Sequence, residues 1–348
     1  MTPTMRAAVL HGQADVRVES VALRPPGPGE VLVRVKAALT CGTDVKVYRR
    51  GYHARMITPP AIFGHEVAGV VEAAGDGVSD WPPGTPVVAA NSAPCGRCGF
   101  CRAGRESLCD DLLFWNGAYA EFALIPARIV GRNLLRLPAG LPFSHAASAE
   151  PLACAVRGVE VAGVAAGQPV AVIGAGPIGL MLVALCRLAG ARVVAAGRRP
   201  ERLAAALALG AQAAVSAGPD ADLGARLRAA SPEAGGFDVV IEASGSVAGS
   251  EAAIAAVRKG GRVNLFAGCP ADARVGLDVA RLHYEELTLT SSFHHDPRAF
   301  REALRLIAER RVDPAAWITA EAPLAELPDV LRGLAEGEGG LKTAIVPG

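Results

Sequence analysis

With 348 residues, the chain is longer than a single hydrophobic core usually supports, so two domains are expected. Its 35 basic and 34 acidic residues give a net charge of +1, which excludes the strong basic field of a nucleic-acid-binding protein and favours a small-molecule partner. Hydrophobic residues make up 51% of the chain but aromatic residues only 5%, a composition that suits an α/β protein with an interior of Ala, Val and Leu.

No targeting or membrane segment is evident in the sequence. Residues 1–24 lack the apolar core of a signal peptide, and Gly, Pro or charged residues interrupt every apolar stretch before it could span a membrane. We therefore expect a cytoplasmic protein with no membrane partner and no nucleic-acid partner. In that reducing compartment, metal binding or catalysis explains the eight cysteines better than disulfides do.

The first part of the chain, up to about residue 150, alternates short apolar runs with Gly/Pro turns, which predicts a mostly β domain. Residues 30–35 and 66–72 are its clearest strands. Cys41 and His65 come close to these strands, with Glu66 directly after the histidine. Thiolate, imidazole and carboxylate are all zinc ligands. Each residue alone is weak evidence, because a buried structural histidine is common, but together with Glu150 they predict a metal centre.

Four further cysteines follow with the spacing C-x2-C-x2-C-x7-C: Cys95, Cys98, Cys101 and Cys109. Four thiolates at this spacing can surround one tetrahedral zinc and leave no open position, so this metal would be structural. An iron–sulfur cluster is the main alternative, yet in that motif the fourth cysteine follows after three residues and precedes Pro. Unligated thiols are a second alternative that such clustering disfavours.

From about residue 170 the pattern changes to repeated strand, turn and helix units, which predict a doubly wound parallel sheet. We expect strands at 169–173, 191–196, 238–242, 262–266 and 287–290, and a helix over the alanine-rich stretch 202–214. Towards the end of the chain, Asp296 caps a predicted helix that runs through residue 307. A helix at 324–334 and a strand at 343–346 complete the expected elements.

The first of these units carries a G-x-G-x-x-G turn between a strand and a helix, the context that makes this motif a dinucleotide-binding fingerprint. Its candidate residues are Gly174, Gly176, Pro177, Ile178 and Gly179. The alternative is a plain strand-to-helix turn.

The next predicted strand ends where NAD enzymes place an acidic residue for the ribose hydroxyls, about 20 residues after the fingerprint. Here the chain has Gly197, followed by Arg198 and Arg199. Loss of the acid and gain of two guanidinium groups favour NADP(H) over NAD(H), with a solvated arginine pair as the alternative.

These motifs together resemble the medium-chain zinc-containing alcohol dehydrogenase family, and within it the sorbitol and threonine dehydrogenase branch. The resemblance covers essentially the whole chain. It implies a GroES-like catalytic domain formed by residues 1–152 and 291–348, and a Rossmann domain formed by residues 153–290. It also implies two zinc ions, one catalytic and one structural, and a homodimer or homotetramer.

By position in the family's motifs, Cys41, His65 and either Glu66 or Glu150 match ligands of the catalytic zinc, and the choice between the two glutamates stays open. Asp44 matches the carboxylate that orients the ligand histidine, and Thr43 matches the hydroxyl that begins a proton relay. The family's next relay histidine is replaced here by Lys46, so Tyr48, His53 or water would continue the relay. Two basic residues match cofactor contacts, Arg202 at the adenosine ribose and Lys342 at the pyrophosphate.

The function implied is hydride transfer between NAD(P) and a hydrophilic secondary alcohol, such as a polyol or cyclitol, with the ketone as the product. A zinc-free alkene or quinone reductase and a non-catalytic, zinc-stabilised nucleotide-binding protein are the alternatives. Five residues are candidates for the substrate pocket: Tyr48, Trp115, Asn116, His294 and His295.

Overall fold

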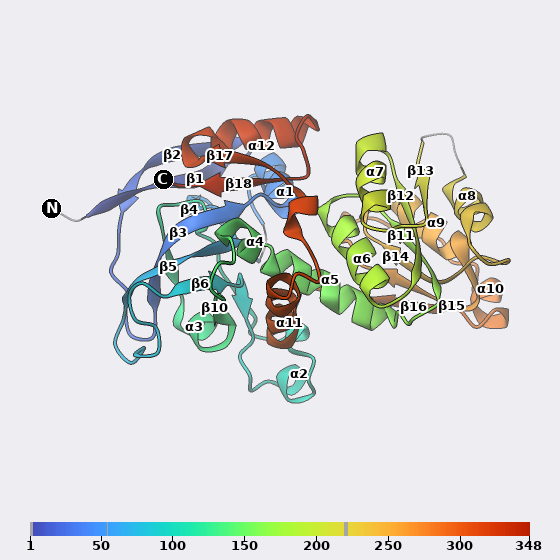
Figure 1. The fold of residues 1–348 in the computed structure, drawn as a ribbon, viewed down its shortest axis with the longest axis horizontal. Helices are drawn as coiled ribbons and strands as arrows, with labels where there is room; N and C mark the ends of the chain where they lie inside the picture. Colours follow the sequence, from blue (N-terminus) through green and yellow to red (C-terminus); the bar gives the residue numbers. More distant parts are fainter. Residues whose placement is uncertain (1–2, 54, 219–221) are drawn as a thin grey trace. The chain divides into compact units, whose positions relative to one another are not determined.

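The computed structural model describes residues 3–53, 55–218 and 222–348, and it divides into two compact units. Unit 1 contains Met1–Ala153 and Asp296–Gly348, and unit 2 contains Cys154–His295. Both ends of the chain therefore contribute to unit 1 (Figure 1). Within the described ranges, no helix combines the length and apolarity that crossing a membrane requires.

Unit 1 is built around one large mixed sheet. Its strands are β3 (Val31–Leu39), β5 (Val67–Ala74), β6 (Pro86–Ala89), β9 (Phe122–Ile125), β10 (Leu134–Arg136), β17 (Ile318–Pro323) and β18 (Lys342–Val346). They follow the order β10-β6-β5-β3-β18-β17, with β9 paired to β3. The C-terminal strand β18 thus lies beside the early strand β3, which places residues about 300 positions apart in adjacent strands.

Two smaller sheets complete the strands of unit 1. Strands β1 (Thr4–Gly12), β2 (Asp15–Ala22) and β4 (Ala61–Ile62) form one, and β7 (Ser92–Ala93) pairs with β8 (Leu113–Phe114) in the other. Buried side chains such as Val33, Val71, Ile125 and Leu331 form one continuous core. The predicted strands at 30–35 and 66–72 are confirmed with small shifts of their ends.

The helices of unit 1 are short, apart from two near the C-terminus. They are α1 (Gly42–Arg50), α2 (Gly99–Arg102), η1 (Glu106–Leu108), α3 (Ala127–Asn133), α4 (Phe143–Ala147), α11 (Pro297–Ala308), η2 (Pro314–Ala316), η3 (Leu324–Glu326) and α12 (Leu327–Glu336). Asp296 caps α11 as predicted, because its Oδ1 accepts the Ala299 N–H at 2.8 Å. Helix α5 (Ala149–Ala162) contains the division between the units.

Unit 2 is a six-stranded, fully parallel sheet. Its strands are β11 (Pro169–Ile173), β12 (Arg192–Gly197), β13 (Ala213–Ser216), β14 (Phe237–Glu242), β15 (Val257–Leu265) and β16 (Thr288–Ser291). Their order is β13-β12-β11-β14-β15-β16, the doubly wound arrangement. Strand β11 is buried at every residue, as expected of a strand covered on both faces.

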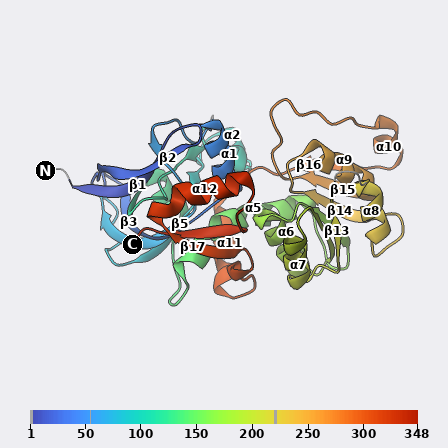
Figure 2. The ribbon, with the colours of Figure 1, turned by 90° about the horizontal axis from the view of Figure 1, so that it is seen from above.

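Helices cover both faces of this sheet. They are α6 (Pro177–Leu188), α7 (Pro200–Ala208), α8 (Leu223–Ala230), α9 (Val247–Ala256) and α10 (Val279–Tyr284). Helices α6 and α7 contact each other and lie on one face, and α8 and α9 contact each other on the opposite face (Figure 2).

One predicted element of unit 2 is wrong. The stretch 202–214 is not one helix, because α7 ends at Ala208 and residues 213–216 form strand β13. Gly210 has a φ of +93°, a left-handed conformation that ends the helix. Alanine occurs in both helices and strands, and here the parallel pairing of β13 with β12 makes residues 213–216 a strand.

Candidate active site

The first metal-ligand candidate lies where strand β3 leads into helix α1. Cys41 is the N-cap of α1, and its Sγ accepts the Thr43 N–H at 3.4 Å. Asp44 Oδ2 accepts the Cys41 N–H at 2.9 Å, so the two residues form a reciprocal capping box. The start of the helix therefore fixes both the thiol and the carboxylate.

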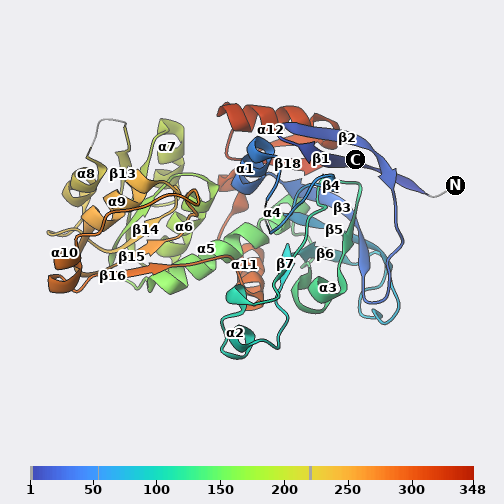
Figure 3. The ribbon, with the colours of Figure 1, turned by 180° about the vertical axis from the view of Figure 1, so that it is seen from behind.

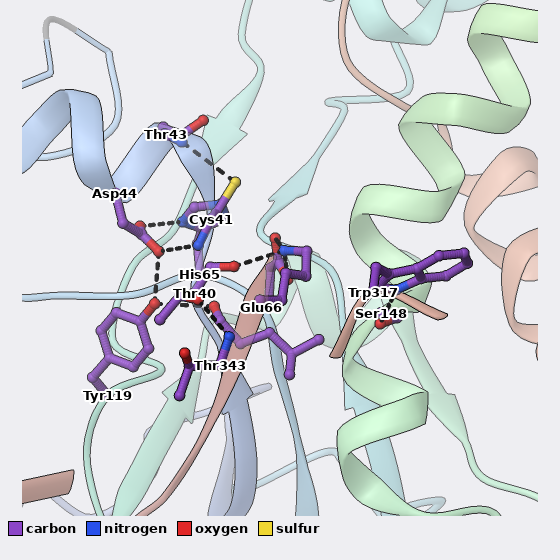
Figure 4. A network of polar contacts seen from close by, with 12 residues as sticks. Thr40, Cys41, Thr43, Asp44, His65, Glu66, Tyr119, Ser148, Trp317 and Thr343 are labelled. Carbon is purple, nitrogen blue, oxygen red and sulfur yellow. Dashed lines mark hydrogen bonds and ion pairs between the residues drawn. The ribbon is translucent and has the colours of Figure 1, made fainter. Parts of the chain in front are cut away.

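His65 and Glu66 lie at the start of the neighbouring strand, β5. Gly64, before them, has a φ of +88°, a turn that favours glycine. The Leu39 N–H donates to the Glu66 carbonyl at 3.1 Å, which ties this turn to the end of β3. Ligand atoms of Cys41, His65 and Glu66 consequently lie within 4.8 Å of one another. We call these three residues the Cys41 centre (Figure 4).

Asp44 lies beside the imidazole of this centre. Its Oδ1 is 3.1 Å from His65 Nδ1, and both side chains are buried. Burial lowers the pKa of His65, but Asp44 and Cys41 outweigh it and raise that pKa well above its usual value. In the neutral ring, which is the form that binds a metal, a proton on Nδ1 leaves Nε2 with its lone pair, the atom a metal would use.

Charges also act on the thiol of Cys41. Burial raises the pKa of this thiol, whereas Lys342 and His65 lower it, and the net result is a pKa of about 7. A thiol with this pKa is readily deprotonated, and the thiolate is the form that binds zinc.

Lys342 is the counter-ion of the centre. Its Nζ donates to both carboxylate oxygens of Glu66 at 2.7 Å and to the carbonyl O of Thr40 at 2.8 Å. Both charged side chains are almost fully buried. A buried carboxylate needs a cation, and Lys342 supplies it for Glu66, while the expected contact of Lys342 with a pyrophosphate stays a prediction.

The donor set of the Cys41 centre fits zinc. A thiolate, an imidazole and a carboxylate are three protein ligands, the number typical of a catalytic zinc with one open position. Glu150 is buried but does not join these three within 4.8 Å, although its charge raises the pKa of Glu66. The geometry therefore favours Glu66 over Glu150 as the third ligand.

The four cysteines at 95–109 also come together, in a loop that projects from the strands of unit 1 around α2 (Figure 3). All four sulfurs lie within 4.8 Å of one another. Backbone N–H groups point at them, for example from Cys98 to Cys95 Sγ and from Cys101 to Cys98 Sγ, both at 3.4 Å. We call this segment, residues 95–112, the four-cysteine loop.

Unit 2 carries a pocket of about 790 Å³ at the carboxyl ends of its strands. Gly174 and Gly176 of the fingerprint turn line it, and Gly176 is the N-cap of α6. Any Cβ on Gly179 would lie 1.6 Å from the carbonyl O of Gly174, so only glycine permits this close helix-to-strand approach. A glycine turn that opens onto a helix N-terminus suits a pyrophosphate.

Gly197, Arg198, Arg199 and Arg202 line the same pocket. Burial lowers the pKa of Arg202, and the charges of Arg199 and Arg198 lower it further. The three guanidinium groups are thus close enough to repel one another, and an anion between them would relieve this repulsion. Asp222 and Glu251 also line the pocket.

Comparison with known proteins identifies the family. The model of the alcohol dehydrogenase GroES-like domain matches residues 27–138, and that of the zinc-binding dehydrogenases matches residues 177–309. The L-threonine 3-dehydrogenase of Bacillus subtilis is 34% identical over 326 residues, which cover 91% of each chain. This chain belongs to the medium-chain zinc alcohol dehydrogenases, in their polyol branch.

Two further relatives of this dehydrogenase are informative. The D-altritol 5-dehydrogenase of Agrobacterium fabrum is 35% identical over 309 residues, which cover 86% of this chain and 87% of that protein. A zinc-binding dehydrogenase from Sinorhizobium meliloti 1021, solved with NADP bound, shares 33% identity and a TM-score of 0.87 over 99% of this chain and 100% of its own. These matches confirm the expected fold and do not favour the zinc-free reductase or the non-catalytic protein.

The dehydrogenase places its predicted pocket residues in different surroundings. Tyr48 and Trp115 are buried in the core of unit 1, and Asn116 Nδ2 donates to the Met56 carbonyl at 2.7 Å. His294 and His295 belong to unit 2, where their ring centroids lie 4.1 Å apart with the rings tilted by 36°. The Asn116 side chain thus binds the loop that precedes β4.

Sequence reasoning missed two residues around the Cys41 centre. The pairing of Lys342 with Glu66 gave no local signal, because 276 positions separate them. The Tyr119 hydroxyl lies 2.6 Å from Asp44 Oδ2, and a buried tyrosine beside a capping carboxylate has no recognisable spacing. In both cases the sheet brings distant residues together.

Proposed function

We propose that this dehydrogenase transfers a hydride between a hydrophilic secondary alcohol and NADP(H). The observation that carries the cofactor preference is the pocket in which Gly197 replaces an acidic residue and three arginines gather: Arg198, Arg199 and Arg202. The NADP bound to the Sinorhizobium meliloti relative supports the same choice.

The 2′-phosphate distinguishes NADP from NAD, and guanidinium groups are its usual partners. A charge-assisted hydrogen bond contributes about 1.5 to 3 kcal/mol, from which desolvation and side-chain ordering must be subtracted. A net gain near 2 kcal/mol corresponds to roughly a thirtyfold preference for NADP.

Arginine variants test this preference directly. Arg198→Ala is expected to reduce kcat/KM with NADP about tenfold or more and to leave kcat/KM with NAD nearly unchanged. Arg192→Ala is the matched control, because Arg192 lies at the opposite end of the same strand and pairs with Glu233 outside the pocket. A wild-type enzyme with higher kcat/KM for NAD than for NADP would contradict the proposal.

Arginine removal is a cleaner test than restoring an acid at position 197. A Cβ on Gly197 would lie 2.8 Å from the Cβ of Ala175, closer than real side chains approach. Gly197→Asp would therefore combine a steric effect on the fingerprint turn with the electrostatic effect of the new carboxylate.

We further propose one catalytic zinc at the Cys41 centre and one structural zinc in the four-cysteine loop. A zinc ion bound by Cys41, His65 and Glu66 would supply Lewis acidity that favours loss of the substrate's hydroxyl proton. Asp44 would hold the His65 ring in the ligating tautomer, as its 3.1 Å approach to Nδ1 indicates. Elemental analysis should find two zinc ions per chain, and one ion or none would contradict this count.

Residues of unit 1 would carry the proton away. Thr43, at the start of α1, would accept it on its hydroxyl. Lys46 is exposed, whereas Tyr48 is buried and His53 is partly buried. Burial lowers the pKa of His53, and so do Arg50 and other neighbouring cations, so this ring is neutral at pH 7 and able to accept a proton. His53 is therefore the preferred outer member of the relay.

The substrate class follows from the relatives. Proteins named for altritol, sorbitol and threonine align over most of this chain, which favours a small, hydrophilic substrate with a secondary hydroxyl. A panel of alditols, cyclitols, threonine and simple aliphatic alcohols, each with NADP, would rank the classes. Faster turnover of the aliphatic alcohols than of every polyhydroxy substrate would contradict the proposal.

We propose that the enzyme assembles as a dimer or tetramer. Strand β16 is an edge of the unit 2 sheet and carries Leu289, and Phe293 beyond it is exposed. An apolar edge strand readily pairs with a second chain. Sedimentation should show a dimer or larger species at micromolar concentration, and a monomer alone would contradict this assembly.

A further inference from the structure

Tyr119 lies between strands β8 and β9, outside every candidate ligand set, and is fully buried. Its hydroxyl is 2.6 Å from Asp44 Oδ2 and 3.0 Å from the carbonyl O of Leu39. A hydroxyl has one proton, and the shorter contact is the charge-assisted one to the carboxylate. Tyr119 is therefore a donor to the residue that orients His65 (Figure 4).

Packing fixes the position of this hydroxyl independently of Asp44. The Tyr119 ring meets Phe63 edge to face, with centroids 5.8 Å apart. On another side it touches Gly64, where any Cβ would lie 2.5 Å from ring carbon Cδ2. The Tyr119 N–H donates to the Phe63 carbonyl at 2.9 Å, so the backbone is held as well. These contacts thus fix the position of the Tyr119 hydroxyl without help from the Asp44 carboxylate.

Two donors act on one oxygen of Asp44, and the other oxygen forms the ion pair with His65. Oδ2 accepts from Tyr119 and from the Cys41 N–H, whereas Oδ1 faces His65 Nδ1. Donors on Oδ2 fix the plane of the carboxylate and draw negative charge toward that oxygen. The carboxylate then attracts the imidazole N–H less strongly, and the imidazole gives less electron density to a metal on Nε2.

We propose that Tyr119 is a positioning residue that sets the orientation and the ligand strength of His65 through Asp44. The inference rests on the proposed function, because it assumes a zinc ion at the Cys41 centre. A purely structural alternative exists, in which Tyr119 only fills the core beside Phe63. Only the first role requires the hydroxyl.

Tyr119→Phe in the full-length enzyme separates the two roles. Without the hydroxyl, negative charge is no longer drawn toward Oδ2, so His65 becomes a stronger ligand and we expect a gain of about tenfold in zinc affinity, the size of effect that groups around a metal ligand exert. Competition with a chelator measures this affinity without reference to turnover. An unchanged affinity would overturn the proposal.

Nuclear magnetic resonance provides a direct signature. With ¹⁵N-labelled histidine, the Nδ1–H proton of His65 should move downfield in Tyr119→Phe, because Asp44 accepts that proton more strongly. Phe63→Leu is the packing control, since it loosens the contact with the Tyr119 ring but removes no polar group. This control should lower thermal stability and leave the resonance in place, and an equal shift in the control would overturn the proposal.

A double-mutant cycle tests whether the effect passes through Asp44. In the Asp44→Asn background, Tyr119→Phe should change zinc affinity by less than twofold, whereas an undiminished tenfold gain there would overturn the proposal. If Tyr119→Phe is unstable, site-specific 3-fluorotyrosine at position 119 serves instead. Its more acidic phenol donates more strongly, so the His65 resonance should move upfield, and no movement would overturn the proposal.

The experiments distinguish failure of the proposed function from failure of the Tyr119 inference. If the wild-type enzyme held no chelatable zinc on which turnover depends, the catalytic zinc and this inference would fall together. If the wild type binds that zinc and Tyr119→Phe matches it in affinity and in the His65 resonance, only the role of Tyr119 falls.

Discussion

The two sets of cysteine-bearing ligands in unit 1 are assembled in opposite ways. The Cys41 centre draws its residues from two separate segments, the start of α1 and the turn before β5, and His65 and Glu66 are 3% and 0% exposed. The four-cysteine loop draws all its ligands from 15 consecutive residues, 95–109, and three of its four thiols are partly exposed. The first site is made by the fold, and the second is made by a local segment.

The different burial of the two ligand sets indicates a different role for a metal at each. The Cys41 centre is surrounded by core residues and by charges already paired inside the protein, such as Glu66 with Lys342. In the four-cysteine loop, where every residue is described, only Ser107 and Cys109 are buried. So little apolar burial cannot offset the entropy of ordering the segment. Under the proposed function, the loop would depend on its metal for structure, whereas the Cys41 centre would use its metal for chemistry.

The largest expected effect is on chemistry at the Cys41 centre. Cys41→Ser should lower kcat/KM by roughly 10³-fold or more, since metal-ion catalysis contributes several kcal/mol and each 1.4 kcal/mol is tenfold. The Kd for NADP and the circular dichroism spectrum should be preserved, because unit 2 forms the nucleotide pocket. Cys269→Ser, at an exposed cysteine outside both sites, should behave as wild type. Activity of Cys41→Ser within tenfold of wild type would contradict the assignment.

The next effect is on stability, through the buried ion pair. In the zinc-free enzyme, Lys342→Met leaves the Glu66 carboxylate buried without its cation, which should lower the free energy of unfolding by about 3 to 5 kcal/mol. Adding Glu66→Gln should recover most of this loss, because no uncompensated charge then remains. Lys36→Met, at an exposed position of β3, is the control for losing a lysine from the same sheet. Urea denaturation measures all three variants, and a loss below about 1 kcal/mol for Lys342→Met would be inconsistent with the pair as described.

The same contrast explains what could be predicted from sequence. The spacing of Cys95 to Cys109 and the turn at Gly174 to Gly179 are local, and the structure places both as expected. Cys41, His65 and Glu66 were each weak evidence alone, because separate segments carry them, and they predicted a metal centre only when taken together. The pairing of Lys342 with Glu66 was not predicted, since it depends on β18 lying beside β3. Strand β13 was missed because tertiary pairing outweighs the weak preference of alanine.

A smaller loss is expected when the metal of the four-cysteine loop is removed. Cys101→Ser should lower the free energy of unfolding by about 3 kcal/mol, the contribution of a ligand present at a few hundred times its Kd. Proteolysis and hydrogen exchange should increase within residues 95–112 and stay unchanged in β3 and β5, because the main core of unit 1 contains no residue of the loop. A chelator strong enough to remove this zinc should destabilise the wild type by the same amount and leave Cys101→Ser unaffected. Equal destabilisation of the variant by the chelator would show that the metal acts elsewhere.

The smallest expected effect on stability is that of replacing Phe100 in the four-cysteine loop, and Phe63 near the Cys41 centre provides the comparison. Phe100 in the four-cysteine loop is 40% exposed, and its one described ring contact is with the Arg105 guanidinium at 6.0 Å. An exposed contact of this kind contributes about 0.5 to 1 kcal/mol, so Phe100→Ala should lower the free energy of unfolding by less than about 1 kcal/mol. Phe63 near the Cys41 centre is 1% exposed, and Phe63→Ala should cost about 3 to 5 kcal/mol. Thermal denaturation of the two zinc-loaded variants makes the comparison. If Phe100→Ala proved as damaging as Phe63→Ala, the loop would hold a packed core of its own, and the metal would not be what organises it.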